Sequence, residues 1–420
     1  MTVVDDVTAA TPSDKPPARR RRRVPLWAWL VLLLVVVSAV RVVSSRHELT
    51  SSGTLREALY AAIPIALAAL AGLWAERAGV VNIGLEGMMI LGTIGGAYFA
   101  FHHGWFLGLV AAILFGALGG ALHALATVWF GVDHIVSGVA INIMAAGLAA
   151  SLARAWFSGL AGGGPTQSPP LPSPPTINIP PVVDAARSVE DRHWFIVSDL
   201  ASIVGALTRN LSTITVVAVV LILASWWILW RTSFGLRLRS CGESPSAAET
   251  LGVDVYRYKT YAVLISGGIA GLAGGFLVVA WAGLYQNGIT NGRGYIGLAA
   301  MIFGNWRPSG LVAGASLFGY TDALQLRAGG GAVHALLIAV ALGLLVYAVV
   351  LLRRARRTAG VAALVAGLLV AFWWSSTDEI ANDFVRMTPY VATLLVLALA
   401  SQRLRMPAAD GKIYRKGEAG

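Results

Sequence analysis

The chain carries little charge for its length. Only 13% of its 420 residues are Asp, Glu, Lys or Arg, whereas 56% are hydrophobic. A soluble domain carries about 25% charged residues. This composition therefore excludes an ordinary soluble protein and indicates a protein that lies within a membrane.

Cysteine and the common catalytic motifs are nearly absent. Cys241 is the single cysteine, which excludes an intrachain disulfide and a thiolate metal cluster. His102, His103, His123 and His134 share no ligand spacing with a cysteine or carboxylate, so we expect no metal site. No phosphate-binding loop, hydrolase elbow or zinc signature is present. We therefore expect a chain that is not an enzyme, holds no cofactor and does not itself bind ATP in the P-loop manner.

Long apolar runs are what the sequence has instead. A helix needs roughly 20 apolar residues to cross a bilayer, and a helix satisfies its own backbone groups there. We predict an all-α integral membrane protein, a polytopic bundle of about 10–12 transmembrane segments within residues 25–405. The predicted segments are 25–43, 55–74, 83–101, 105–130, 134–157, 205–230, 260–282, 294–306, 309–326, 333–352, 360–375 and 388–402. The eighth is too short to span fully and is expected to be broken or re-entrant.

Basic residues set the expected topology. The formal net charge is +11, and the Lys and Arg residues gather beside the apolar runs. The positive-inside rule places every strong basic cluster on one side of the twelve segments. Residues 1–24 are then a cytoplasmic basic tail, and residues 406–420 a cytoplasmic C-terminal tail. This distribution favours membrane topology and anionic lipid over nucleic acid. The run Leu26–Val40 has no small-residue cleavage site of the usual kind, so we expect a retained first span.

Two loops are long. Residues 158–204 are expected outside and are rich in Pro and Gly, which predicts an extended external cap or linker rather than helix. Residues 231–259 are expected inside, where a helix-compatible stretch lies between Pro245 and Gly252.

Short segments also repeat along the chain. Ile83-Gly-Leu-Glu-Gly-Met88 matches Ile296-Gly-Leu-Ala-Ala-Met301, and Gly108-Leu-Val-Ala111 matches Gly310-Leu-Val-Ala313. In the predicted topology the first copy starts outside and the second starts inside. Two halves of opposite orientation form the inverted repeat that is common in transporters, with the substrate path between them.

Polar side chains at membrane depth are candidates for that path, because such residues are costly in lipid. They are Asn82, Glu86, Ser137, Asn142 and Asn305. Asn82 and Glu86 are four residues apart and so share a helical face. Two interpretations of Glu86 stay open: a role in the path, and the capping of a broken helix or pairing with an arginine. For Asp322, near the end of its segment, a structural role is favoured.

Aromatic and small residues have ordinary explanations beside their functional ones. Trp281, Tyr285 and Tyr295 flank the external end of a predicted span, where an interfacial belt is the default. Base stacking by Trp281 or Tyr285 is the alternative. Gly267, Gly271 and Gly275 are spaced by four, which predicts close helix packing.

The internal loop carries a family resemblance. Thr232-Ser-Phe-Gly-Leu-Arg-Leu-Arg239 and the following Gly242–Val253 resemble the coupling segment of ABC permeases in the branched-chain amino-acid/ribose class. In that class a short helix here fits a cleft on the ATPase. The resemblance implies ATPase contact by Glu243, Pro245, Ala247, Ala248, Glu249, Gly252 and Val253.

Further segments narrow the resemblance. Residues 75–87, 136–142 and 292–304 look like the nucleoside/simple-sugar branch. That branch implies the membrane permease subunit of a bacterial ABC importer, which moves nucleosides by alternating access. It implies a multi-pass chain in the bacterial cytoplasmic membrane with both termini inside. Its implied partners are a homologous second permease, an ABC ATPase that holds ATP and Mg²⁺, and an extracytoplasmic substrate-binding lipoprotein.

Two alternatives stay open. The same architecture could move ribose, another simple sugar or a branched-chain amino acid. An ion-coupled secondary transporter could use Glu86 and Asp322 as proton carriers, although the coupling-segment resemblance counts against it.

Overall fold

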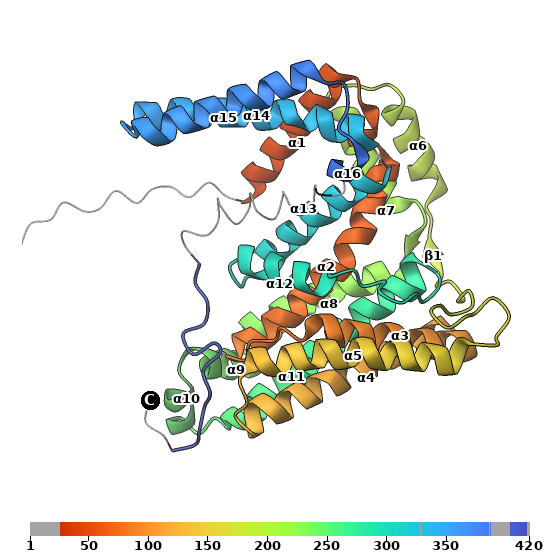
Figure 1. Ribbon diagram of the computed structural model, residues 1–420, viewed down its shortest axis with the longest axis vertical. Helices are drawn as coiled ribbons and strands as arrows, with labels where there is room; N and C mark the ends of the chain where they lie inside the picture. Colours follow the sequence, from red (N-terminus) through yellow and green to blue (C-terminus); the bar gives the residue numbers. More distant parts are fainter. Residues whose placement is uncertain (1–25, 328, 386, 388–403, 418–420) are drawn as a thin grey trace, which may run out of the picture.

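A computed structural model of the chain describes residues 26–327, 329–385, 387 and 404–417. The described residues are mostly helical, as Figure 1 shows, and contain one two-stranded antiparallel sheet of two-residue strands. The first half of the chain forms α1 (Leu26–Ser44), η1 (His47–Leu49), α2 (Ser52–Arg77), α3 (Leu85–His103), α4 (Trp105–Ala124), the π-helical η2 (Leu125–Trp129), α5 (His134–Phe157), β1 (Thr176–Ile177), α6 (Pro180–Glu190) and α7 (Val197–Thr208).

The second half continues with β2 and a further series of helices. They are β2 (Leu211–Ser212), α8 (Thr213–Arg231), α9 (Ser233–Glu243), α10 (Pro245–Thr250), α11 (Val255–Gly275), the π-helical η3 (Phe276–Trp281), α12 (Arg293–Phe303), α13 (Pro308–Arg327), α14 (Gly329–Arg353), α15 (Arg357–Ser376) and α16 (Asn382–Val385). The prediction of an all-α polytopic membrane protein is confirmed.

Seven of the described helical segments are long and apolar enough to cross a membrane. They contain α2, α4, α5, α8, α11, α14 and α15. The predicted spans over α1, α3, α12 and α13 are also helical, and of these α12 is short and α3 and α13 are less apolar. The predicted segment 388–402 and the basic tail 1–24 lie outside the described residues.

One expectation about the external loop is wrong. Residues 158–204 contain α6 and most of α7, rather than an extended cap throughout. Pro180 is at the first position of α6, where proline's missing N–H costs nothing. The irregular parts are the Pro- and Gly-rich residues before β1 and the shorter connections on either side of α6.

The helices pack in a reciprocal pattern. Helix α2 lies against α12 and α13, and α11 lies against α3 and α4 (Figure 1). This exchange between the two halves of the chain agrees with the predicted inverted repeat. Helices α9 and α10 lie at one end of the bundle, named here the α10 end, and β1 lies at the opposite end, named the β1 end.

Glycines allow the closest of these contacts. A Cβ at Gly267 would lie 2.5 Å from the carbonyl oxygen of Gly116, and one at Gly271 would lie 2.1 Å from that of Ala112. A Cβ at Gly275 would also meet Ala112. The structure thus places the three predicted packing glycines against α4, where association in lipid depends on close van der Waals contact.

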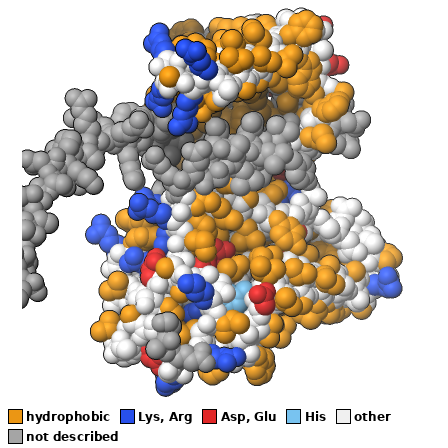
Figure 2. Space-filling model, turned by 60° about the vertical axis from the view of Figure 1, so that its left-hand side comes forward, with side chains coloured by type: hydrophobic (Ala, Val, Ile, Leu, Met, Phe, Trp, Pro, Cys, Tyr) orange, Lys and Arg blue, Asp and Glu red, His pale blue; other side chains and the backbone are white. Residues whose placement is uncertain are grey.

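The outer surfaces are apolar. Figure 2 shows broad hydrophobic areas on the main body and on the α14–α15 hairpin, with Lys and Arg gathered toward the ends. Exposed Leu, Val, Ile and aromatic side chains occur along α5, α8, α14 and α15. Lipid or another membrane subunit is the natural environment of such faces.

Candidate translocation junction

A loop that folds back into the bundle leads into α3. Helix α2 ends at the α10 end, where the Lys259 ammonium group donates to the Gly79 carbonyl over 3.4 Å. Three residues later, the Asn82 amide donates to the Ser266 hydroxyl over 2.9 Å. Lys259 and Ser266 are two turns apart on α11, about 10 Å along the helix axis. The N-terminus of α3 therefore lies inside the bundle.

Helix α12 also begins inside the bundle. Gly297 on α12 packs against Ala68 and Ala69 in the middle of α2. Beyond the C-terminus of α12, the Trp306 carbonyl accepts from the guanidinium of Arg77, the last residue of α2. Helix α12 therefore packs only along the C-terminal part of α2. Residues 282–292 connect it to the end of η3 at Trp281. The expectation of a broken eighth segment agrees with this arrangement.

Glu86 joins the two helix beginnings. Its carboxylate accepts from the backbone N–H of Gly292 over 3.0 Å and from that of Gly294 over 2.6 Å. The side chain is 6% exposed, and no arginine or lysine forms an ion pair with it among the residues that the structure describes. The first N–H groups of a helix have no partner within it and favour negative charge. Of the two open interpretations, the geometry supports the cap of a broken helix.

Asn142 on α5 holds the beginning of α3. Its side-chain oxygen accepts from the Gly87 N–H over 2.7 Å, and its amide nitrogen donates to the Ile83 carbonyl over 3.0 Å. The same nitrogen lies 2.9 Å from the Tyr295 hydroxyl, in the first turn of α12. Tyr295 was expected in an interfacial belt at the external end of a span. The structure instead brings it to the junction, because α12 starts inside the bundle.

Two histidines hold the backbone of the loop before α3. The Val81 N–H donates to Nδ1 of His134 over 3.2 Å, and the Val81 carbonyl lies 3.0 Å from Nε2 of His123. Nδ1 of His123 lies 2.9 Å from the Ser137 hydroxyl. Ser137 therefore acts on the loop through His123. Sequence reasoning missed this role, since neither histidine has a motif around it.

Asn305 does not join the other path candidates. It lies in the turn after α12, at the α10 end, and its side-chain oxygen accepts from the Arg405 N–H over 2.7 Å. Its φ of 55° is left-handed, a conformation that asparagine tolerates better than most residues. Asp322, for which a structural role was expected, pairs with Arg293 over 2.9 Å.

The two base-stacking candidates differ in exposure. Tyr285 is 2% exposed and packs against Phe157, so neither ring face is open in this conformation. Trp281 is half-buried; its indole N–H donates to Glu57, and the Arg293 guanidinium lies 4.6 Å from its ring centroid. Only Trp281 of this pair therefore retains part of a ring surface at the β1 side of the junction.

The predicted coupling helix is present as α10. Pro245 begins it, Gly252 follows it at a φ of 81°, and Ala247 points to solvent. Ala248 is 2% exposed and packs with Cys241 and Val255. It therefore supports the helix from inside and is not available for the ATPase contact that was expected of it.

The other residues of the predicted coupling set lie at the rim of this helix. Glu243, the last residue of α9, is exposed and 3.8 Å from Arg77. Glu249 in α10 and Val253 in the turn after it are half-buried. Leu251, which sequence reasoning left out, is 84% exposed. Leu251 is the one large apolar residue between Pro245 and Gly252, and this was the available signal for it.

The junction is built from backbone N–H groups and hydrogen-bonding side chains. Within the described part of the chain, no group of three or more His, Cys, Asp or Glu side chains could hold a metal ion. Two helix N-termini meet at the centre of a membrane bundle, as in transporters whose broken helices line the substrate site. This architecture defines the class: a polytopic helical membrane protein of the transporter type.

Comparison with known proteins gives the family. The family described as branched-chain amino acid transport system / permease component matches residues 54–352. The chain belongs to this family of permeases. The match excludes α1, α15 and the C-terminal residues 404–417.

Individual relatives cover most of the chain. The guanosine ABC transporter permease protein NupQ of Bacillus subtilis is 32% identical over 86% of this chain and 95% of its own length. The nucleoside ABC transporter permease protein NupC of Lactococcus lactis is 32% identical over 84% of this chain and 94% of its own. A putative glucose ABC transporter permease of Haloferax volcanii is 33% identical over 66% of this chain and 78% of its own. No solved structure matches the chain.

Proposed function

We propose that this chain is the permease subunit of an ABC importer that moves nucleosides into a bacterial cell by alternating access. The observation that carries the proposal is the junction of α3 and α12 beside an exposed coupling helix. The names of two relatives that match nearly end to end support the substrate. ATP and Mg²⁺ belong to a partner ATPase, since the sequence has no phosphate-binding loop.

The charge at the junction favours a neutral substrate. Glu86 already occupies the N-terminus of α12 with a carboxylate that accepts two backbone N–H groups. A second carboxylate brought there, as on a branched-chain amino acid, would meet like charge in a poorly solvated site. A nucleoside or a simple sugar has no such charge, so the amino-acid alternative is disfavoured.

The basic residues support the orientation. Arg231, Arg237 and Arg239 lie at or near α9, and Arg353 and Arg357 lie at the turn between α14 and α15. Figure 1 places this turn on the same side as α10. The positive-inside rule makes the α10 end cytoplasmic. Helices α6 and α7 are then external, where a substrate-binding lipoprotein would deliver its cargo, and a second homologous permease completes the membrane part.

Leu251 provides a direct test of coupling. An 84% exposed leucine on the cytoplasmic surface suits burial in a cleft of the ATPase. Leu251→Asp should abolish co-purification of the ATPase and lower nucleoside uptake at least about tenfold, since a buried unpaired charge costs several kcal/mol. Leu251→Met, which keeps size and polarity, is the matched control. Normal uptake by the Leu251→Asp protein, at wild-type membrane levels, would contradict coupling through α10 and favour a secondary transporter.

Deletion of the chain tests the substrate. Radiolabelled guanosine, uridine, ribose and leucine should be offered separately to cells with and without the chain. We expect the deletion to remove nucleoside uptake and leave leucine uptake intact. Loss of ribose or leucine uptake alone would overturn the nucleoside assignment and retain the permease assignment.

A further inference from the structure

The C-terminal residues 404–417, named here the strap, lie across the α10 end of the bundle. On one side the strap holds the coupling helices. The Tyr414 hydroxyl donates to the Glu249 carboxylate of α10 over 2.6 Å. Burial, and then the nearby Glu249 carboxylate, raises the pKa of Tyr414, so this hydroxyl stays protonated as a donor. The Ala409 N–H donates to the Gly242 carbonyl of α9 over 2.9 Å.

On the other side the strap holds the end of α2 and the turn after α12. Asp410 is buried beside the carboxyl group of Glu76 at the end of α2, and burial raises the pKa of Asp410 to about 7. Glu76 also accepts from the Trp306 indole N–H over 2.5 Å, in the turn after α12. The Arg405 N–H donates to Asn305 in the same turn.

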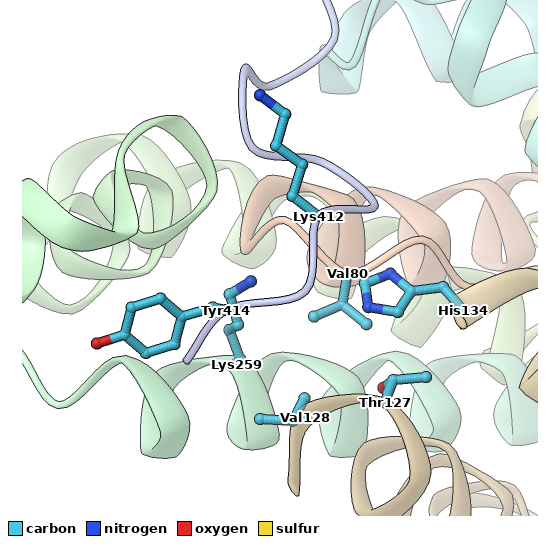
Figure 3. Close-up of a pocket in the computed structure, with 7 residues that line it drawn as sticks. All are labelled: Val80, Thr127, Val128, His134, Lys259, Lys412 and Tyr414. Atoms are coloured by element: carbon cyan, nitrogen blue, oxygen red, sulfur yellow. The ribbon is translucent and has the colours of Figure 1, made fainter. Parts of the chain in front are cut away.

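The strap is a packed element and not only a surface contact. Ala409 is 5% exposed and Asp410 7%, and the Tyr414 ring packs against the cluster of Cys241, Ala248 and Val255. Figure 3 shows the strap passing over Val80, in the loop between α2 and α3, and over Lys259 of α11, with Lys412 and Tyr414 projecting from it. Buried polar groups that are hydrogen-bonded fix one arrangement.

The strap leaves the outer surface of α10 free. Ala247, Thr250 and Leu251 remain exposed while Tyr414 is bound to Glu249 on another side of the helix. An ATPase can therefore dock on α10 without displacing the strap. Arg77 forms a second link between the same parts, since it contacts both Glu243 and the Trp306 carbonyl.

We propose that the strap couples α10 mechanically to the turn after α12, with Tyr414 and Asp410 as positioning residues, so that a displacement of the coupling helix moves the broken helix. Helix α12 carries the movement to its N-terminus, where Glu86 caps it from α3. This inference rests on the proposed importer function for its consequence, although the docking of the strap can be tested without it.

Cys241, the single cysteine, reports docking directly. It is fully buried beneath Tyr414, and burial raises its pKa to about 11, so the thiol should react slowly with a maleimide. In the purified full-length chain, Tyr414→Ala with Asp410→Ala should increase the labelling rate about tenfold or more, as local opening exposes the thiol. Lys416→Ala, an exposed change in the same strap, is the control. Unchanged labelling in the double variant would show that the strap does not cover α9 and α10.

Coupling is measured on the assembled transporter in proteoliposomes, as nucleoside moved per ATP hydrolysed. Coupling free energies commonly correspond to about 5–150-fold effects, so the double variant should lower this ratio at least about fivefold while hydrolysis continues. Tyr414→Phe removes only the hydrogen bond to Glu249 and should lower the ratio less. An unchanged or increased ratio in a variant with exposed Cys241 would overturn the positioning role. If the wild-type complex moves no nucleoside, the proposed function fails instead, and the labelling result still decides whether the strap docks.

Discussion

The two long central helices, α2 and α11, have equivalent neighbours but different contacts. Helix α11 meets α4 through glycines on both sides, including Gly116, Gly267 and Gly271. Helix α2 meets α13 with alanines facing Gly319, and it meets the short α12 through Ala68 and Gly297. The first contact is backbone on backbone along a continuous helix, whereas the second includes a helix with an end inside the bundle.

This difference indicates which half moves. Close glycine contacts give many van der Waals contacts and little freedom. Helix α12 also packs closely, through Gly297 against α2 and Gly294 against α3, but it has 11 residues where α11 has 21 and it begins inside the bundle, so it can shift as a unit. We infer that α3, α4 and α11 form the fixed side of the path and that α12 forms the movable side. The following predictions test that division, from the largest effect to the smallest.

Disruption of the fixed side should have the largest effect. A valine at Gly271 would overlap the carbonyl oxygen of Ala112, which lies 2.1 Å from the expected Cβ position. Gly271→Val should separate α4 from α11 and remove the folded protein from the membrane, a loss above about 4 kcal/mol. Gly343→Val on α14 is the control, because nothing lies within 4 Å of its expected Cβ. Immunoblots of membranes and thermal unfolding in detergent measure the outcome. Normal folding of the Gly271→Val protein would contradict a rigid α4–α11 contact.

Loss of the cap on α12 should have the next largest effect. Glu86→Ala leaves the N–H groups of Gly292 and Gly294 without their charged acceptor. A hydrogen bond to a charged group is worth about 1.5–3 kcal/mol, so uptake should fall at least about tenfold. Glu48→Ala, an exposed carboxylate of η1, serves as the control. If Glu86 were instead a proton carrier, Glu86→Gln would abolish proton-driven uptake by this chain alone, a process we expect to be absent.

Loss of the Asn142 side chain should have a smaller effect. Asn142→Ala removes a neutral acceptor from Gly87 and the contact with Tyr295. An unsatisfied buried N–H costs about 1–3 kcal/mol, and α3 keeps its packing on α4 and α11. We expect uptake to fall about fivefold, with Tyr295→Phe falling less. An Asn142→Ala defect greater than that of Glu86→Ala would place the movable part on the α3 side.

The smallest effect concerns the pH dependence of strap docking at the end of α2. Burial raises the pKa of Asp410 from 3.8 to about 7, against the lowering effects of Glu76, Lys259 and Arg77. The docked strap therefore binds a proton that a released strap would lose. Docking should be strongest below the ordinary pKa, weaken as pH rises toward about 7, and change no further above it.

Cys241 labelling checks this dependence. Rates at about pH 5.5 and about pH 8 should each be divided by the rate of a chain truncated after residue 403 at the same pH, since thiol ionisation itself changes with pH. The ratio should rise with pH in the wild type. Asp410→Asn, which is always neutral, should flatten it. A ratio that falls with pH would show that Asp410 docks as a carboxylate.

The sequence by itself determined the membrane class, the positions of most helices and the presence of the short helix α10. Apolar runs, basic clusters and the stretch from Pro245 to Gly252 are local signals, and local physics is enough to interpret them. The glycine spacing on α11 was equally readable, since helical periodicity alone places Gly267, Gly271 and Gly275 on one face.

Only the tertiary structure decided which polar residues meet. Glu86 and Gly294 are far apart in the sequence, and so are Asn142 and Tyr295. They meet because the loop before α3 and the broken helix α12 both enter the bundle. The repeated Ile-Gly-Leu motif ends on Leu85, the first residue of α3, but lies wholly inside α12, so equal sequence takes unequal positions. The strap brings Asp410 beside Glu76 of α2, and no local pattern could indicate that pair. Long-range contacts of this kind depend on the packing of the whole bundle, which hydrophobic periodicity does not encode.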